Sequence, residues 1–494
     1  MTGNVGSVFG AAPYEWWHGS PLTPNTGTVV FEDVIFDGSC APKENWEDLH
    51  LPNYSDSHFA TNDPTSSWRA GFMLGMDSFD SVTFRSCRFT NFARGVCANA
   101  CGTAIMRDCY SDCVDSWGQV LFVPERCDRV EFCGNTCLGT DYSSFFLQTG
   151  QRGAAACSVI LPRAANDILI ASNNLRGHQL VVQSGDLAHV ENSRCVVTGN
   201  IIDYPPADTA VYGYNSVVCT GNISRRSGDV GFSFDESRYV TCCANVVEGA
   251  NTAGITIFNA EGCVINDNTV QDIGQMYDDA FITSHYPPSQ WSSEILIAIR
   301  IAGLTEGDAA VVMKECVISG NALRQTKPLW WTSKTGASPA AVVVGYGNLH
   351  NTLMDATGQT VVVQGNVATV NPQLFPDFSI TVAECTCAVD RSSTKGKFRR
   401  GEVITGQTSK ARARFVAFAS SDLVGNGAPP LMFFAQPVGA FAAGETVAGT
   451  GGGSVRLGAP LKAVWTGAVL AGNVDLHTQR GGQAVGSGAL AARY

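Results

Sequence analysis

A short pattern that recurs at a nearly constant interval constrains the fold of this chain most. Each copy is a short apolar run, then a small or polar residue, an asparagine and another apolar residue. The asparagines are Asn200, Asn222, Asn245 and Asn268, so the intervals are 22, 23 and 23 residues. A fixed interval of this length is typical of a solenoid, in which each repeat forms one coil.

The residues within each copy indicate strands. They are β-branched, alternate in polarity and lack the spacing of an amphipathic helix. Three short strands fit in one coil, and each strand pairs with its copies in neighbouring coils about 4.8 Å away. Residues one interval apart therefore stack, and we expect the asparagines to form a ladder at a tight corner, where asparagine tolerates the left-handed backbone conformation. The sequence predicts a right-handed parallel β-helix.

The ladder extends beyond these four asparagines. Its predicted members are Cys87, Cys109, Asn135, Asn173, Asn200, Asn222, Asn245, Asn268, Asn321 and Asn366. Intervals longer than one period indicate loop insertions, which in solenoids gather on one face. A second series of strands, such as those from Gln179 and Val230, precedes the ladder positions.

The pattern ends near Pro376, and a different domain follows. It contains two copies of an aromatic-x-x-Gly-Glu motif, from Phe398 and Phe441, each with a strand, a Gly-rich turn and a second strand. This duplication predicts a small antiparallel β domain. We therefore expect an all-β chain with three parts: an N-terminal cap or attachment segment at 1–27, the β-helix at 28–375 and the C-terminal β domain at 376–494.

Charge and composition exclude several classes of function. The net charge of −12 argues against a nucleic-acid partner, which would need a basic face. No apolar run has the length of a membrane span, and Met1–Ala12 lacks the features of a signal peptide, so synthesis in a bacterial cytoplasm is expected. The 18 cysteines are then expected as buried thiols, with disulfides and a metal site as less favoured alternatives. No nucleotide, metal or triad motif occurs, so neither a cofactor nor a metal is predicted.

Carboxylates remain as candidates for catalysis. Glycosidases use two carboxyl groups, about 5 Å apart for retention or roughly 6.5–9.5 Å apart for inversion. Coils about 4.8 Å apart supply both separations. The catalytic candidates are Asp235, Glu236 and Glu261, which lie at ends of the second strand series.

Aromatic and polar side chains beside these carboxylates are candidates for sugar binding. Aromatic rings stack on the apolar faces of sugars, and acids and amides bond their hydroxyl groups. The candidates come from strand ends and from the loop Gln275–Glu294. They are Gln183, Tyr214, Tyr277, Asp278, Asp279, Tyr286, Trp291 and Arg300.

The Val-x-x-x-Gly-Asn-x-apolar ladder resembles the pectate-lyase-like right-handed β-helices over roughly Thr28–Pro372. A large β-helix without a secretion signal, followed by a β-rich domain, resembles bacteriophage tailspikes and related spikes of phage-like particles. The Gly-Glu repeats are similar to small β modules of phage structural proteins. The resemblance implies a homotrimer on a virion, attached to other particle proteins, that binds host cell-surface or capsular polysaccharide.

Three functions follow from this reading of the sequence. The first is a virion spike that binds host polysaccharide, with or without depolymerase activity. The second is a polysaccharide lyase or glycosidase on the same fold. The third is a purely structural trimeric spike.

Overall fold

A computed structural model describes most of the strands of the chain. The described residues are 27–37, 74–90, 94–113, 120–139, 158–160, 164–183, 190–205, 208–251, 253–258, 261–274, 297–302, 315–327, 340–344, 358–371, 380–382, 384–398, 401–419, 431–463, 465–478 and 484–486. They form strands and turns, and none of them belongs to a helix that could cross a lipid bilayer. The chain forms two compact units, residues 1–241 and 242–494.

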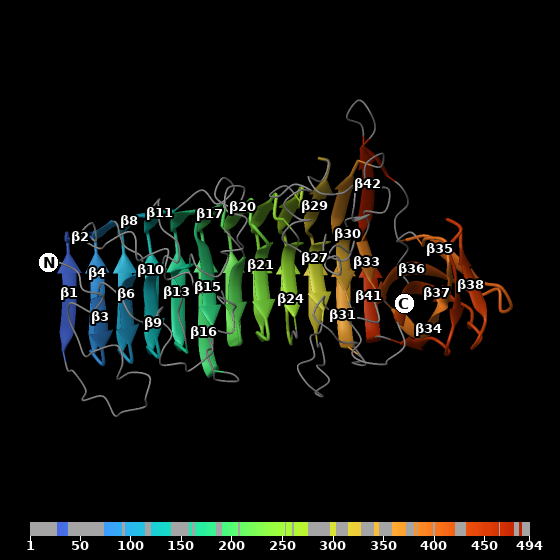
Figure 1. Ribbon diagram of the computed structural model, residues 1–494, viewed down its shortest axis with the longest axis horizontal. Coiled ribbons are helices and arrows are strands. Elements are labelled where there is room, and N and C mark those ends of the chain that lie inside the picture. The colour runs from blue at the N-terminus through green and yellow to red at the C-terminus, as the bar shows by residue number, and fades with distance from the viewer. Residues whose placement is uncertain are drawn as a thin grey trace. The chain divides into compact units, whose positions relative to one another are not determined.

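The first unit consists of three parallel sheets, in which each strand pairs with the strand three places further along the chain (Figure 1). The first sheet contains β1 (Thr28–Glu32), β4 (Ser81–Arg85), β7 (Thr103–Arg107), β10 (Arg129–Cys133), β13 (Asp167–Ala171), β16 (Val190–Thr198) and β19 (Tyr214–Thr220). The second contains β2 (Ile35–Asp37), β5 (Arg88–Thr90), β8 (Tyr110–Cys113), β11 (Thr136–Gly139), β14 (Asn174–Arg176), β17 (Ile201–Asp203) and β20 (Ile223–Arg225). The third contains β3 (Leu74–Asp77), β6 (Arg94–Asn99), β9 (Val120–Glu125), β12 (Ser158–Ile160), β15 (Gln179–Gln183), β18 (Thr209–Tyr212) and β21 (Val230–Asp235).

The second unit begins within β22 (Val240–Cys243) and continues the same arrangement. Its first sheet contains β25 (Val264–Asn266), β28 (Cys316–Ser319), β31 (Gly358–Gln364) and β41 (Trp465–Ala471). Its second contains β23 (Val246–Glu248), β26 (Thr269–Gln271), β29 (Ala322–Gln325), β32 (Val367–Val370), β42 (Val474–Thr478) and the antiparallel β43 (Ala484–Gly486). Its third contains β24 (Ala253–Phe258), β27 (Ile297–Ala302), β30 (Ala340–Val344) and β33 (Ile380–Val382).

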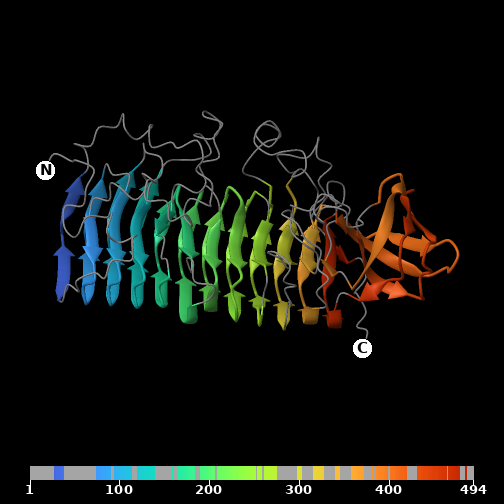
Figure 2. The same cartoon turned by 60° about the horizontal axis from the view of Figure 1, so that its bottom comes forward.

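An antiparallel barrel lies between β33 and β41 in the sequence (Figure 2). Its strands are β34 (Cys385–Lys395), β35 (Val403–Gly406), β36 (Arg412–Ala419), β37 (Leu431–Val438), β38 (Thr446–Gly449), β39 (Ser454–Leu457) and β40 (Lys462–Ala463). The sheet closes because β34 pairs with both β37 and β39, and Ile404, Phe434, Val447 and Val455 are among its buried core residues. The predicted all-β class, a parallel solenoid with a separate antiparallel sheet, is confirmed.

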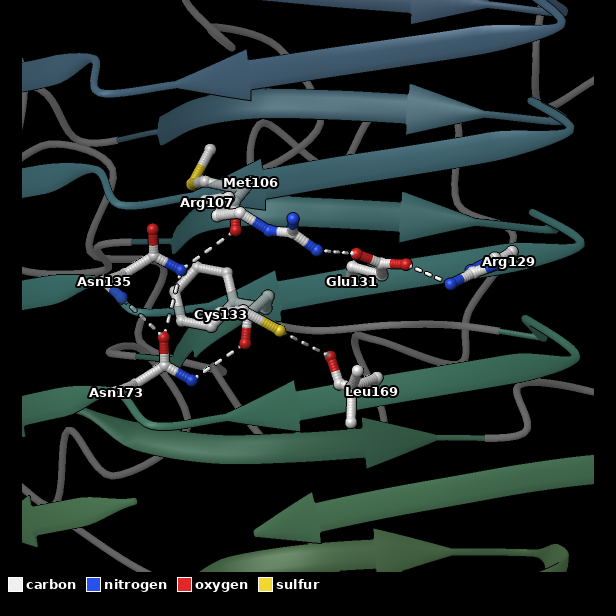
Figure 3. A network of polar contacts seen from close by, with 9 residues as sticks. Met106, Arg107, Arg129, Glu131, Cys133, Asn135, Leu169 and Asn173 are labelled. Carbon is white, nitrogen blue, oxygen red and sulfur yellow. Dashed lines mark hydrogen bonds and ion pairs between the residues drawn. The ribbon is translucent and has the colours of Figure 1, made fainter. Parts of the chain in front are cut away.

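The asparagine ladder exists in both units. In the first unit the Nδ2 atoms of Asn135, Asn173 and Asn200 each donate to the Oδ1 atom of the next ladder asparagine at 2.8–3.0 Å. Figure 3 shows the bond from Asn135 to Asn173. That Oδ1 atom also accepts from the backbone N–H of the donor asparagine. The same two bonds link the second unit's asparagines, which are Asn245, Asn268, Asn321, Asn366 and Asn473.

Cysteines take the ladder position in the first coils, as predicted. The Sγ atom of Cys109 lies 3.6 Å from the Phe84 carbonyl oxygen, and the backbone N–H of Cys109 donates to Asn135 Oδ1. The described cysteines are free thiols. Burial raises the pKa of Cys109 and of Cys195 to about 12, so both thiols stay protonated at neutral pH.

Two expectations about the ladder were wrong. The left-handed conformation belongs to the residue before each ladder position, from Ser86 to Gly472, with φ between 51° and 68°. The asparagine itself follows this turn, and its side chain forms hydrogen bonds to the neighbouring coils. The ladder also does not end at Asn366, because Asn473 accepts from Asn366 after the chain has completed the barrel. The bounds 28–375 and 376–494 remain a prediction, and within the latter span β41 and β42 pair with β31 and β32.

The barrel's sequence duplication corresponds to a reciprocal exchange of hydrogen bonds. Glu445 of the second copy accepts from the backbone N–H groups of Thr408 and Ser409 in the turn of the first. Glu402 of the first copy accepts from the backbone N–H of Gly451 in the turn of the second. The repeated Gly-Glu motif therefore places a carboxylate under the turn of the opposite copy.

Candidate functional site

The third sheet of the first unit is buried on both faces along the middle of its strands. In β15, Leu180, Val181 and Val182 are at most 6% exposed, and in β21 the same holds for Phe232, Ser233 and Phe234. Where the structure describes side chains on this sheet, the half-buried ones are at carboxyl ends of strands, at Glu125 of β9, Tyr212 of β18 and Asp235 of β21. Polar chemistry on this sheet is therefore accessible at the strand ends.

Three residues at these ends occupy one column across three coils. Gln183 of β15 pairs with Tyr212 of β18, and Tyr212 pairs with Asp235 of β21. Val211 and Phe234, one residue earlier on each strand, are buried in the interior, so Tyr212 and Asp235 lie on the outer face. Parallel register places successive members about 4.8 Å apart, the spacing of adjacent strands.

Asp208 joins this column from the start of β18. The Tyr212 hydroxyl donates a hydrogen bond to Asp208 Oδ2 at 3.2 Å, and the Ser233 hydroxyl donates to Asp235 Oδ1 at 3.1 Å. Burial, and after it the charges of Asp229 and Asp235, raise the pKa of Asp208 to about 8. Asp208 is thus a carboxylic acid that keeps its proton at neutral pH beside a second carboxyl group.

We call Gln183, Asp208, Tyr212, Ser233 and Asp235 the third-sheet site. Its half-buried side chains offer the Tyr212 hydroxyl, the Asp235 carboxyl group and the protonated acid of Asp208, whereas Ser233 is 3% exposed and serves to bond Asp235. Such groups can bond sugar hydroxyls, and a protonated acid can donate to a glycosidic oxygen. Among the described residues, no three His, Cys, Asp or Glu side chains are grouped so as to hold a metal ion.

The structure separates the residues that the sequence singled out. Asp235 and Gln183 belong to the third-sheet site. Glu236 follows β21 with φ of 54°, and Glu261 lies half-buried in the second unit, so their pairing stays a prediction. Arg300 of β27 pairs with Thr256 and Val343 in the second unit. The loop candidates Tyr277, Asp278, Asp279, Tyr286 and Trp291 lie outside the described residues.

Tyr212, and not the predicted Tyr214, lies at the end of the third-sheet strand. Gly213 adopts φ of 73° and separates β18 from β19, so the strand of the third sheet ends at Tyr212. Tyr214 begins the first-sheet strand and is 1% exposed, which leaves no surface for a sugar. The glycine between two tyrosines was the signal in the sequence that could have distinguished them.

A buried carboxylate on the first sheet has a different role. Glu131 is 4% exposed and forms ion pairs with Arg107 and Arg129, as Figure 3 shows. Two guanidinium groups thus neutralise Glu131 on the outer face of β10. We assign Glu131 a structural role, in contrast to Asp208, whose described neighbours are other acids and a tyrosine.

The match to a family model agrees with the fold. A family model described as a right-handed β-helix region matches residues 151–285, which include the third-sheet site. Among solved structures, the chain is similar to the tailspike gp61 of Pseudomonas phage phi297, with 12% sequence identity and a TM-score of 0.29. That similarity covers 77% of this chain and 66% of the tailspike chain. No curated protein has a significantly similar sequence.

Proposed function

We propose that the protein is a virion spike that binds host cell-surface polysaccharide at the third-sheet site. The observation that carries the proposal is the column in which Tyr212 and Asp235 of adjacent coils pair on the outer face, with Asp208 bonded to Tyr212. Repetition along the β-helix axis suits a polymer, because equivalent positions recur at each coil. The assignment to a virion rests on the resemblance of the sequence to phage tailspikes.

Retention on purified polysaccharide tests this proposal. Surface polysaccharides from a panel of bacterial strains are immobilised, and binding of the full chain is measured. We expect retention on a subset of them and a loss of about tenfold in affinity for Asp235→Ala, which removes charged hydrogen bonds. Asp112→Ala is the matched control, because Asp112 also accepts a tyrosine hydroxyl, from Tyr110, but on the second sheet. Retention that Asp235→Ala leaves unchanged would contradict the assigned site.

Cleavage of the bound polymer is a second candidate function, favoured by the proton on Asp208. A general acid works best when its pKa lies near the working pH, and the pKa of Asp208 is about 8. In this proposal Asp208 protonates the leaving oxygen while Asp235 acts as base or nucleophile. New reducing ends would indicate a hydrolase, and unsaturated ends would indicate a lyase.

Two variants separate cleavage from binding. Asp208→Asn should lower the cleavage rate by about 10²–10⁴-fold, the usual contribution of a general acid, and leave retention intact. Wild-type cleavage should decline as the pH rises above about 8, because Asp208 then loses its proton. Retention on the polysaccharide without a cleavage product would indicate a binding protein that does not cleave. The absence of both retention and product would favour a purely structural spike.

The proposed assembly is a homotrimer attached to other particle proteins. Mass photometry of the purified chain should then give about 157 kDa, three times the chain mass of 52.3 kDa. A monomer at all accessible concentrations would contradict the trimer and would leave the glycan site to be tested separately.

A further inference from the structure

Two arginines enclose a tyrosine at the corner that follows the second sheet of the first unit. The Arg176 guanidinium carbon lies 5.6 Å from the Tyr204 ring centroid, and that of Arg226 lies 5.5 Å from it. Arg176 ends β14, Tyr204 follows β17 and Arg226 follows β20, so the three side chains come from three successive coils. We call Arg176, Tyr204 and Arg226 the Arg–Tyr ledge.

The ledge is exposed and carries positive charge on an acidic protein. Arg176 and Arg226 are exposed and Tyr204 is half-buried. The neighbouring Arg225 pairs with Asp203 at 3.4 Å, so the ledge and this pair together hold three arginines and one aspartate. The whole chain has a net charge of −12, which makes this corner a local exception.

The backbone indicates that the side chains themselves matter at this corner. Tyr204 and Arg226 adopt φ of 55° and 52°, in the left-handed region that glycine occupies at least cost. Gly177 lies at the same corner of the preceding coil. Its N–H donates to the backbone carbonyl of Asp203, just as the N–H of Tyr204 donates to the backbone carbonyl of Arg225. The fold thus accepts glycine here, yet two of these coils have a large side chain.

The chemistry of the ledge fits an anionic ligand. A guanidinium stacked on an aromatic ring is held in place, while its N–H donors remain directed outward in its own plane. Those donors match carboxylate or sulfate oxygens in a bidentate manner. Two such groups two coils apart, roughly 9.6 Å, can contact successive charges along one polymer.

We propose that the Arg–Tyr ledge binds the acidic groups of an anionic polysaccharide. Arg176 and Arg226 contact the anions, and Tyr204 is the positioning residue that holds both guanidinium groups. The inference rests on the proposed function, because it names the chemical class of the polymer that the spike recognises.

Three polymers of defined charge test the inference. Polygalacturonate supplies carboxylates, dextran sulfate supplies sulfates and dextran is neutral; binding of the full chain to each is measured at low and high salt. We expect retention on at least one anionic polymer, weaker at high salt, and no retention on dextran. The polymer that is retained identifies the anion as carboxylate or sulfate.

Matched variants assign the binding to the ledge. The double variant Arg176→Gln with Arg226→Gln should weaken binding at least about tenfold. Arg194→Gln is the control, since Arg194 is also an exposed arginine but lies on the first sheet, where it pairs with Asp167 at 2.8 Å, and it should change affinity less than about twofold. Tyr204→Gly should weaken binding while leaving the unfolding midpoint unchanged or higher, a combination that a purely structural ring would not give.

The outcomes separate this inference from the proposed function. Equal binding by the double variant and the wild type would overturn the ledge. Retention only on neutral bacterial polysaccharide would also overturn it, while leaving the third-sheet site and the proposed function in place.

Discussion

At the scale of single residues, the ladder asparagines carry much of the order of the fold. Asn200 is fully buried and uses its amide four times. Its Nδ2 atom donates to the Ile170 carbonyl and to Asn222, and its Oδ1 atom accepts both N–H groups of Asn173. Removing the amide would leave buried polar groups of two neighbouring coils without their partner.

We therefore expect Asn200→Ala to destabilise the protein by about 3 kcal/mol, the range for losing a buried hydrogen-bond network. The denaturant midpoint of the full chain measures the effect. Asn174→Ala, at an exposed position of the adjacent strand β14, is the control and should change it by less than about 0.5 kcal/mol. Equal midpoints for the two variants would show that the ladder contributes little.

Asp208 should make stability depend on pH in the direction unusual for an aspartate. Its folded pKa, about 8, lies above its ordinary value of 3.8. The contribution of protonated Asp208 to the free energy of unfolding is therefore fully present below about pH 4 and is lost as the pH rises toward 8. The asparagine of the Asp208→Asn variant cannot ionise. The free energy of unfolding of this variant, minus that of the wild type, should therefore increase from about pH 4 to about pH 8 and stay constant above pH 8.

Unfolding midpoints at pH 5, 7 and 9 measure this trend. Asp112→Asn is the control, because Asp112 also accepts a hydrogen bond from a tyrosine hydroxyl. A difference between Asp208→Asn and wild type that does not vary with pH would show that Asp208 is solvated like an ordinary aspartate.

At the scale of elements, the two halves of the barrel depend on each other through Glu402 and Glu445. Burial opposes the charge of Glu445, but hydrogen bonds from Ser409, Ala442 and Thr408 outweigh it and lower the pKa of this carboxyl. The resulting stability is present above the ordinary pKa of 4.5 and is lost as the pH falls through the lower folded value.

Glu445→Gln should therefore cost about 2 kcal/mol at pH 7, and the difference from wild type should shrink toward pH 3. Hydrogen exchange of peptides from β35 to β39 reports the loss within the barrel. Glu402→Gln, the equivalent position of the other copy, is more exposed and should have the smaller effect. Faster exchange confined to the solenoid strands would contradict the reciprocal arrangement.

The sequence predicted the elements better than it predicted the site. The fixed interval identifies the ladder because one asparagine per coil must meet the next. Asn473 was not found because 107 residues, including the barrel, separate it from Asn366. Of the proposed third-sheet site, Asp235 and Gln183 follow from strand alternation, whereas the sequence did not indicate Tyr212, because the turn at Gly213 resets the alternation before Tyr214. The proton on Asp208 depends on burial and on Asp229 and Asp235, which only folding brings near it.

At the scale of the whole molecule, the three sheets of the first unit carry different groups of polar side chains. The first sheet neutralises Glu131 between two arginines, the second ends at the Arg–Tyr ledge and the third presents the third-sheet site. The inward side of each sheet is mostly apolar, with exceptions such as Ser111 and Ser224, and stacked residues such as Phe31 and Phe84, with ring centroids 5.0 Å apart, hold the coils in register. A rigid scaffold of this kind positions surface groups without a conformational change.

Backbone hydrogen exchange of the full chain, with and without a polysaccharide that it retains, tests the central claim most directly. We expect bound polymer to slow exchange at the carboxyl ends of β15, β18 and β21 and to leave exchange in the barrel strands β34 to β39 unchanged. Slower exchange only in the barrel, or none anywhere despite retention, would contradict a polysaccharide site on the third sheet.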